Sequence, residues 1–452
     1  MAKKSYQIDM MSGPLLKKII IFSIPVMLTG MLQLLYNAAD VVVVGKFSGE
    51  VSLAAVGSTG SLINLIVNTF FGLSLGSGVV VSQSIGANNK ARLTKTVHTS
   101  MLLSLICGVI VAVIGFSFSN QLLNLMSTPA DVIDKATLYM RIYFLGMPGF
   151  MIYSFGSAIL RSSGDTKRPL LILSISGFVN VVLNLIFVIY FKMDVVGVSL
   201  ATIISQYISA IWVVVILVKE NADYKLFIKK LRIHKNELFL IIVFGMPIGI
   251  QSACFSISNV AIQSSINTLG TLVVAGNSAA SNVEGFVYQA TTSVSQAAIT
   301  FSGLYTGAGN YKKVKEVLIN CTALSTLFGI IIGIIVIIFK SPILSFYTNN
   351  SAVINAGIIR LNIMCLFYGL CGAMDTIANV SRGMGKSVVP MIITLVFVCM
   401  VRILWVYTIF EFFNTAESVF WSYPVTWTIA IICQLAYFAF VYKSKIKNEV
   451  LE

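Results

Sequence analysis

The chain of 452 residues consists of long apolar runs separated by short polar segments. A helix that crosses a bilayer needs about 20 predominantly apolar residues. Twelve runs are long enough, and they predict helices at 19–44, 52–82, 96–119, 136–160, 170–191, 195–218, 238–268, 271–305, 317–339, 355–381, 389–410 and 418–442. We therefore expect an all-α integral membrane protein with twelve transmembrane helices and both termini on the same side of the membrane.

The composition agrees with this prediction. Hydrophobic residues make up 57% of the chain and charged residues 11%, whereas a soluble domain carries about a quarter charged residues. The net charge of +14 does not indicate nucleic-acid binding, because the basic residues cluster in short segments between the apolar runs. The first run is too long for the apolar part of a cleavable signal peptide, so we interpret it as an uncleaved span.

Lysine and arginine residues predict the orientation of the spans. With both termini inside the cell, the cytoplasmic segments hold 24 of the 31 basic residues, Lys3 and Lys4 among them. The opposite side holds Lys46, Lys135, Lys192 and Lys340, and Arg141, Arg360 and Arg402 lie within spans. An excess of this kind marks the cytoplasmic side. We expect a multi-pass protein of the cell (inner) membrane with cytoplasmic termini.

The second half of the chain repeats the first. SIGANNKAR at 84–92 corresponds to YTGAGNYKK at 305–313, and RSSGDTKRP at 161–169 corresponds to RGMGKSVVP at 382–390, both at an offset of 221. Pro25 corresponds to Pro247 at an offset of 222. Six spans per half with the same orientation form a parallel repeat. The sequence thus predicts two six-helix lobes related by a pseudo-two-fold axis, an N-lobe at 1–218 and a C-lobe at 238–452, joined by a basic cytoplasmic linker at 219–237.

Polar residues recur at helical spacing within the spans, as expected where two lobes enclose a cavity. Five spans carry such stripes: Gln33, Tyr36, Asn37 and Asp40; Ser61, Asn64 and Asn68; Ser176, Asn180 and Asn184; Thr202, Gln206 and Ser209; Ser252, Ser256, Asn259 and Gln263. The alternative is that these groups hydrogen-bond between helices, as polar residues often do in membrane bundles. The sequence favours a wetted cavity but leaves both interpretations open.

Asp40 is the most unusual residue of these stripes. A carboxylate near the middle of a membrane helix costs roughly 2.5–3.5 kcal/mol on insertion scales. At the helical rise, Asp40 is about 6 Å below the outer end of its span, and Asn184 and Thr202 are about 10 Å below theirs. Their oxygen atoms suit a small hard cation, or Asp40 can hold a proton. A structural aspartate is the alternative.

Two other acids lie within spans. Glu284 is near mid-depth in 271–305, with Tyr288 one turn further on, and Asp375 lies in the cytoplasmic half of 355–381. Each either attracts a cationic substrate, couples ion movement or pairs with Arg402. Arg141 and Arg360 begin their spans at the outer side, where we expect them to extend to the surface. Pro25 and Pro247 are expected to be kink sites.

Catalytic motifs are not convincing. GLSLG at 72–76 fits G-x-S-x-G, but that motif needs a strand–turn–helix context and a histidine partner, and here it lies in a predicted span. The seven cysteines form no C-x-x-C pair, so neither a disulfide framework nor a zinc site is indicated. No Walker sequence is present. We expect no enzyme, no cofactor and no use of ATP by this chain.

Several segments together resemble the multidrug and toxic compound extrusion (MATE) family. They are SIPVMLTGMLQLLYNAADVVVVGKFSGEVSLAAVGSTGSLINLIV, QSIGANNKARL, FGSAILRSSGDTKRPLL and AASNVEGFVYQATTSVSQAAITFSGLYTGAGNYKK. The resemblance spans nearly the whole chain. It implies two lobes around a V-shaped central cavity, and antiport of amphipathic, usually cationic, compounds against Na⁺ or H⁺.

The resemblance also implies site residues. The N-lobe cation site of the family carries over to Asp40, Asn180, Asn184 and Thr202. Some members have an aspartate where this chain has Asn184, so the choice of ion stays open. Another branch has a glutamate on the seventh helix, whereas the span at 238–268 contains no acid. A C-lobe Na⁺ site of that type is therefore not expected.

These observations predict a monomeric, cation-coupled exporter of amphipathic, mostly cationic compounds, whose partners are those compounds and the lipid bilayer. The predicted cavity residues are Gln33, Tyr36, Asn37, Asn64, Asn68, Asn259, Gln263, Glu284, Tyr288 and Asp375. The alternative is a flippase for lipid-linked precursors. A flippase for pyrophosphate lipids needs several cations in its cavity, whereas Arg402 is the only arginine well inside a span and three acids are there.

Overall fold

The computed structural model describes residues 7–126 and 128–451, and the regular elements of this part of the chain are all helices. Lys3 and Lys4 lie outside the described residues. The first half contains α1 (Leu15–Phe47), α2 (Glu50–Gly86), α3 (Lys90–Leu125), α4 (Ile133–Leu145), α5 (Met147–Ser162), α6 (Lys167–Leu185), the π-helical η1 (Ile186–Tyr190) and α7 (Asp194–Lys219).

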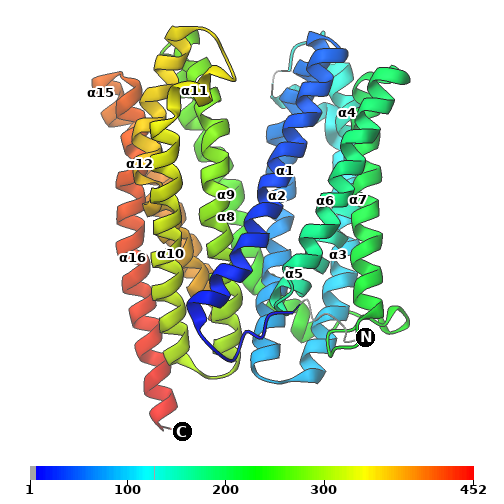
Figure 1. Cartoon of the computed structure of the whole chain (residues 1–452), viewed down its shortest axis with the longest axis vertical. Coiled ribbons are helices and arrows are strands. Elements are labelled where there is room, and N and C mark those ends of the chain that lie inside the picture. The colour runs from blue at the N-terminus through cyan, green and yellow to red at the C-terminus, as the bar shows by residue number, and fades with distance from the viewer. Residues whose placement is uncertain (1–6, 127, 452) are drawn as a thin grey trace. The chain divides into compact units, whose positions relative to one another are not determined.

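A short 3₁₀ turn, η2 (Ile228–Lys230), follows in the linker. The second half contains α8 (Lys235–Asn267), α9 (Thr271–Gly307), α10 (Tyr311–Ile338), α11 (Lys340–Ser345), α12 (Ser351–Gly383), α13 (Val388–Thr394), η3 (Leu395–Met400), α14 (Val401–Trp405), η4 (Val406–Phe410), α15 (Glu411–Phe413) and α16 (Ala416–Leu451). Figure 1 shows these helices running along one common direction within each half.

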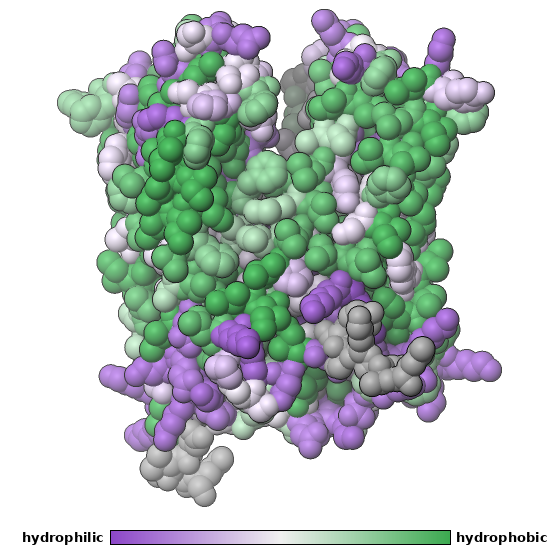
Figure 2. Space-filling model, in the orientation of Figure 1, coloured by the Kyte–Doolittle hydropathy of each residue, from purple (hydrophilic) through white to green (hydrophobic). Residues whose placement is uncertain are grey.

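The predicted spans correspond to these helices, which extend beyond most of the predicted ends. Among the described residues, ten helices are long and apolar enough to cross a membrane, and the pair α4 and α5 makes an eleventh. The predicted span at 271–305 coincides with α9, which falls short in apolar character because of polar residues such as Asn277, Asn282 and Glu284. Figure 2 shows apolar side chains along the middle of the helices and hydrophilic ones toward both ends.

Three predicted spans contain irregularities that the hydrophobic pattern does not indicate, and the span predicted at 170–191 ends in the π-helical turn η1. The span predicted at 136–160 bends by 46° between α4 and α5. Gly146 lies at the bend, where an added Cβ would be 2.1 Å from the Gln206 side-chain oxygen, and Pro148 lacks the N–H that a continuous helix needs. The span predicted at 389–410 alternates between α-helical and π-helical turns, η3 and η4.

By its contacts the chain divides into two compact units. The first unit comprises residues 7–9 and Leu28–Gly249, and the second comprises Met10–Met27 and residues 250–451. Each unit has its own buried apolar core, around Met140 and Phe144 in the first and around Leu361 and Phe420 in the second. The lobe boundaries predicted at 218 and 238 follow the repeat rather than contacts, and they stay a prediction.

The division crosses two helices at equivalent positions. The first part of α1 belongs to the second unit and its remainder to the first, whereas the first part of α8 belongs to the first unit and its remainder to the second. In each helix the change follows two residues after a proline, Pro25 or Pro247. The prolines thus mark the places where α1 and α8 pass from one unit to the other.

Glycines hold the first part of α8 against α2 in the first unit. An added Cβ on Gly72 would lie 2.4 Å from the Gly249 nitrogen, and one on Gly76 would lie 2.5 Å from the Gly245 nitrogen. Gly72 and Gly76 are four residues apart on α2, and Gly245 and Gly249 are four residues apart on α8. This small-xxx-small spacing lets membrane helices approach closely. The GLSLG segment at 72–76 therefore serves as a helix-packing surface.

Candidate functional site

The polar residues predicted around Asp40 meet in the first unit. Asp40 lies on α1, Asn180 and Asn184 lie one turn apart on α6, and Thr202 lies on α7. The Asn184 side-chain nitrogen donates hydrogen bonds to the Asp40 carboxylate and, over 3.3 Å, to the Asn180 amide oxygen. Asn180 donates to the Thr202 hydroxyl over 3.4 Å, and that hydroxyl is also a hydrogen-bond partner of Asp40. We call these four residues the Asp40 cluster.

The Asp40 cluster has unused oxygen acceptors and no compensating cation. In the part of the chain that the structure describes, no lysine, arginine or histidine lies within 4 Å of the Asp40 carboxylate. Asn184 is completely buried, yet its side-chain oxygen accepts no hydrogen bond. Asp40 itself is half-buried, and a carboxylate in a membrane helix beside a buried, unpartnered oxygen is costly unless a cation or a proton completes it.

The charge of the cluster limits what it can hold. Asp40 is its single acidic member, and no group of three or more histidine, cysteine, aspartate or glutamate residues forms a metal cluster among the described residues. Carboxylate, amide and hydroxyl oxygens are ligands for hard cations. One negative charge matches one monovalent cation or one proton.

Neighbouring residues fix the position of the cluster. Tyr36, one turn before Asp40, donates a hydrogen bond of 3.1 Å to the Ser174 carbonyl on α6. Its ring lies against Gly177, where an added Cβ would meet the ring at 1.8 Å. Tyr36 was predicted to line a cavity, and the structure gives it a packing contact that holds α1 against α6. The π-helical turn η1 begins two residues after Asn184, and such turns are frequent at functional sites.

Two tyrosines near Asp40 were not predicted. Tyr139 and Tyr143 lie on α4, and their side chains are within electrostatic range of the Asp40 carboxylate. The Tyr143 hydroxyl is a hydrogen-bond partner of Gln206 on α7. Their spacing of four residues places both on one helix face, but tyrosines are common in membrane helices and no sequence signal separated these two.

Five of the predicted cavity residues carry exposed side-chain amides: Gln33, Asn37, Asn64, Asn68 and Asn259. None of them makes a side-chain hydrogen bond with another described residue. The alternative for the polar stripes was hydrogen bonding between helices, and exposure without such bonds disfavours it for these five residues, whereas Tyr36, Asn184 and Gln263 do bond to other helices. An exposed amide in a membrane-spanning helix needs water, because lipid offers it no partner.

Glu284 does not pair with Arg402, which was one of the predicted alternatives. Its two oxygens accept hydrogen bonds of 2.7 and 2.8 Å from Arg360. Arg360 also donates to the Asn277 oxygen over 2.5 Å, and Asn277 donates to Gln263 over 3.0 Å. The expectation that Arg360 extends to the membrane surface is wrong, because its side chain is buried in this network between α9 and α12.

Asp375 does not pair with Arg402 either. It is half-buried on α12, and its hydrogen-bond partner is the Tyr288 hydroxyl on α9. Arg382 interacts with Asp375 electrostatically but forms no ion pair with it, and its own hydrogen bonds go to Gln251 over 2.6 Å and to Asn379 over 2.7 Å. The structure therefore brings together two predicted cavity residues, Asp375 and Tyr288.

The second unit has no counterpart of the Asp40 cluster. At the repeat offset of 221, Asn180, Asn184 and Thr202 correspond to Val401, Trp405 and Tyr423. At the offset of 222, Asp40 corresponds to Ile262. The equivalent region instead contains the buried guanidinium of Arg402, which lies 4.0 Å from the centre of the Tyr423 ring and donates to Thr426 over 3.1 Å. The two halves share a fold but differ in the sign of the charged group in this region, Asp40 in the first and Arg402 in the second.

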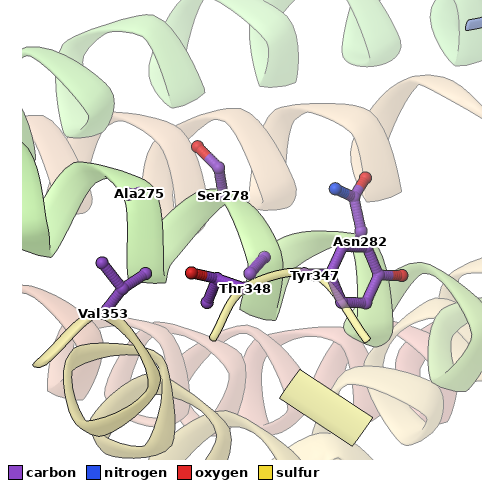
Figure 3. Close-up of a pocket in the computed structure, with 7 residues that line it drawn as sticks. Ala275, Ser278, Asn282, Tyr347, Thr348 and Val353 are labelled. Carbon is purple, nitrogen blue, oxygen red and sulfur yellow. The ribbon is translucent and has the colours of Figure 1, made fainter. Parts of the chain in front are cut away.

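A surface hollow of about 360 Å³ lies between α9 and the segment that follows α11 (Figure 3). Its lining residues are Ala275, Ser278, Ala279, Asn282, Tyr347, Thr348 and Val353. None of them was predicted to line a cavity. Three of the seven lining residues come from a short loop and the start of α12, where no helical periodicity marks the inward-facing residues.

Comparison with known proteins agrees with the duplicated architecture. A family model described as MatE matches the chain twice, at residues 25–186 and 247–408. The probable multidrug resistance protein YoeA of Bacillus subtilis is 27% identical over 433 residues, which cover 94% of both chains. The probable multidrug resistance protein NorM of Thermotoga maritima is 26% identical and covers 88% of this chain and 86% of its own.

A solved structure shares the fold. The outward-facing structure of a multidrug resistance MATE family transporter of the MOP superfamily has a TM-score of 0.91 at 22% sequence identity, and the match covers 98% of this chain and 100% of the other. The duplicated helical architecture and these matches define a multi-pass membrane transporter. The two matches to the family model cover more than two thirds of the sequence, and the chain belongs to the MatE family, whose members are multidrug and toxic compound extrusion transporters.

Proposed function

We propose that the chain is a cation-coupled antiporter that exports amphipathic, mostly cationic compounds and takes up Na⁺ or H⁺ in exchange. The observation that carries this proposal is the Asp40 cluster, a lone membrane carboxylate beside the unpartnered oxygen of Asn184. Relatives named as probable multidrug resistance proteins support the type of cargo.

The coupling follows from the charge of Asp40. A coupling ion drives a conformational change only if its affinity differs between the two states. Asp40 is ionised when the cluster is open to the outside, and a bound ion or proton neutralises it before the cluster is enclosed. Asp40 lies on α1, which passes from one unit to the other near Pro25. The charge state of Asp40 therefore affects a helix that belongs to both units.

Exposed polar side chains and Asp375 are proposed to receive the cargo. In the first unit, the exposed amides on α1 and α2 offer hydrogen bonds. In the second unit, Asn259 on α8 offers another, and Asp375 with Tyr288 offers a negative charge beside an aromatic ring. Glu284 contributes less attraction for a cation than we expected from the sequence, because Arg360 neutralises it. The flippase alternative is disfavoured because Arg402 is engaged with the Tyr423 ring and Thr426.

The proposed setting is the cell membrane, with both termini in the cytoplasm and the chain acting as a monomer. The orientation rests on the excess of basic residues on one side of the spans. Labelling of single cysteines in intact cells tests it. A cysteine placed at Lys445 is expected to resist a membrane-impermeant reagent, and one placed at Lys340 is expected to react.

The function is tested by efflux of a fluorescent lipophilic cation from proteoliposomes in which sodium and pH gradients are imposed separately. We expect one gradient to drive efflux in the wild type, and Asp40→Asn to abolish it. Asp134→Asn is the matched control, because Asp134 is an exposed acid outside the Asp40 cluster. Wild-type transport by Asp40→Asn contradicts the proposal, and so does dye movement that neither gradient drives.

A further inference from the structure

The linker between α7 and α8 is an ordered segment that lies against α3. The Thr94 hydroxyl donates to the Asp223 carbonyl over 3.3 Å, and the Thr99 hydroxyl accepts the His234 N–H over 3.0 Å. Between these points, His98 accepts the Phe227 N–H over 3.1 Å. His98 and both threonines are on α3, so one helix holds the linker at three places along its length.

The linker has an inner face and an outer face. Tyr224 and Leu226 are buried, at 4% and 2% exposure. Phe227 and Ile228 point outward, at 41% and 58% exposure. Apolar side chains this exposed on a segment held by hydrogen bonds leave apolar surface that the other described residues do not cover.

Basic side chains surround the two exposed apolar residues. The ammonium groups of Lys225 and Lys230 lie 5.5 and 5.1 Å from the centre of the Phe227 ring. Lys229 and Arg232 are also exposed. We call Lys225, Phe227, Ile228, Lys229, Lys230 and Arg232 the linker patch.

The acids of the linker do not neutralise this patch. Glu220 forms an ion pair of 2.5 Å with Arg168, and Asp223 forms one of 3.2 Å with Lys90. Within the described residues, no carboxylate lies within 4 Å of a basic side chain of the linker patch. The patch therefore presents four uncompensated positive charges around apolar side chains.

The position of the linker indicates which partner this chemistry fits. It joins the end of α7 at Lys219 to the start of α8 at Lys235, and both helices are long and apolar enough to span a membrane. We therefore expect this short ordered segment at the level of the lipid headgroups. Phe239, in the first turns of α8, is 66% exposed and continues the apolar surface toward the bilayer interior.

We propose that the linker patch is a docking surface for anionic phospholipid headgroups of the membrane in which the protein lies. The basic groups contact lipid phosphates, while Phe227 and Ile228 enter the boundary between headgroups and acyl chains. Soluble phosphate satisfies the charges alone and leaves the apolar pair exposed to water. A lipid satisfies both parts of the patch.

The test compares lipid binding by variants of the full chain purified in an uncharged detergent. Binding of fluorescent phosphatidylglycerol is titrated, and retained lipids are counted by native mass spectrometry. In the linker variant Lys225, Lys229 and Lys230 are replaced by glutamine. We expect phosphatidylglycerol binding at least about tenfold weaker, because each lysine near an anionic surface is worth roughly fivefold.

The matched control replaces Lys312, Lys313 and Lys315 by glutamine, which removes the same charge near the start of α10. Residues 308–318 there expose no large apolar side chain. We expect its phosphatidylglycerol affinity to stay within about threefold of wild type. Equal losses in both variants indicate non-specific attraction and overturn the proposal, as does wild-type binding by the linker variant.

A second pair of measurements separates lipid from other anions. Replacing Phe227 and Ile228 by serine keeps every charge, and we expect it to weaken phosphatidylglycerol binding at least about threefold. Phosphatidylcholine and inorganic phosphate are expected neither to bind comparably nor to displace phosphatidylglycerol. Displacement by millimolar phosphate identifies a soluble-anion site instead, and displacement by an oligonucleotide identifies a nucleic-acid surface; either result overturns the proposal.

Discussion

Among single residues, the charged side chains within the helices differ in the groups that neutralise or hydrogen-bond to them. Arg360 and Glu284 neutralise each other, whereas Arg402 relies on an aromatic ring and a hydroxyl. Asp40 has amide and hydroxyl partners but no cation. A charge that is paired inside the protein stabilises one structure, whereas a charge left for an external ion can respond to that ion. This contrast separates the structural role of Glu284 from the proposed coupling role of Asp40.

The first prediction concerns the Arg360–Glu284 pair. Glu284→Gln leaves a buried guanidinium without its counter-charge, and we expect it to lower the free energy of unfolding by about 3–5 kcal/mol. Glu316→Gln is the control, because Glu316 forms an exposed pair with Lys313 that is worth at most about 1 kcal/mol. Thermal unfolding in detergent measures both. Reduced transport with unchanged stability indicates that Glu284 contacts cargo and contradicts the structural role.

The sequence predicted the Asp40 cluster but not the pairing of Glu284. Asp40 and Asn184 stand out locally, because a polar side chain in an apolar run is visible in the sequence and the family resemblance indicates which of them meet. Arg360 and Glu284 are 76 residues apart. The sequence offered Arg402 as a partner for Glu284 and placed Arg360 at the membrane surface. Which charges neutralise each other depends on how α9 and α12 are rotated, and an apolar run does not encode that rotation.

At the scale of elements, small residues and helix breaks control how the helices approach. The apolar runs predicted the helices because a span needs a fixed length of apolar residues. They did not predict the bend at Gly146 or the π-helical turns, because both depend on neighbouring helices rather than on hydrophobicity. The α2–α8 contact is the clearest case, since it forms through glycines that carry no hydrophobic signal.

The second prediction tests this contact. In Gly76→Ala the new Cβ would lie 2.5 Å from the Gly245 backbone, and we expect overpacking to cost about 1–3 kcal/mol of stability. Gly60→Ala is the control on the same helix, because nothing lies within 4 Å of its Cβ position. There we expect no loss, and a gain of up to about 1 kcal/mol from higher helix propensity. Equal melting temperatures for the two variants rule out the packing role.

At the scale of the whole molecule, the exchange of α1 and α8 between the units is the main constraint. Both helices change unit two residues after a proline. A helix proline removes one backbone hydrogen bond and eases bending. In the proposed antiport cycle, bending at Pro25 and Pro247 lets the units change their relation while both helices stay continuous.

The third prediction concerns these prolines. Pro25→Ala and Pro247→Ala restore a backbone hydrogen bond and stiffen α1 or α8. We expect efflux to slow several-fold while the binding affinity for the coupling ion stays within about twofold. Pro424→Ala is the control, because Pro424 lies inside α16, which belongs entirely to the second unit. An equal slowing by Pro424→Ala shows that the effect is not specific to the exchanged helices.

The single carboxylate of the Asp40 cluster has an electrical consequence. In the proposed antiport, a site with one negative charge takes up one monovalent ion per cycle, and the equivalent region of the second unit contains a positive side chain instead. Export of a monovalent cationic compound in exchange for one such ion moves no net charge across the membrane. The membrane potential, worth about 2.3 kcal/mol per charge per 100 mV, then contributes nothing to the export of that compound. The concentration gradient of the ion alone sets how far the compound can be depleted from the cell, whereas export of a divalent cation works against the inside-negative voltage.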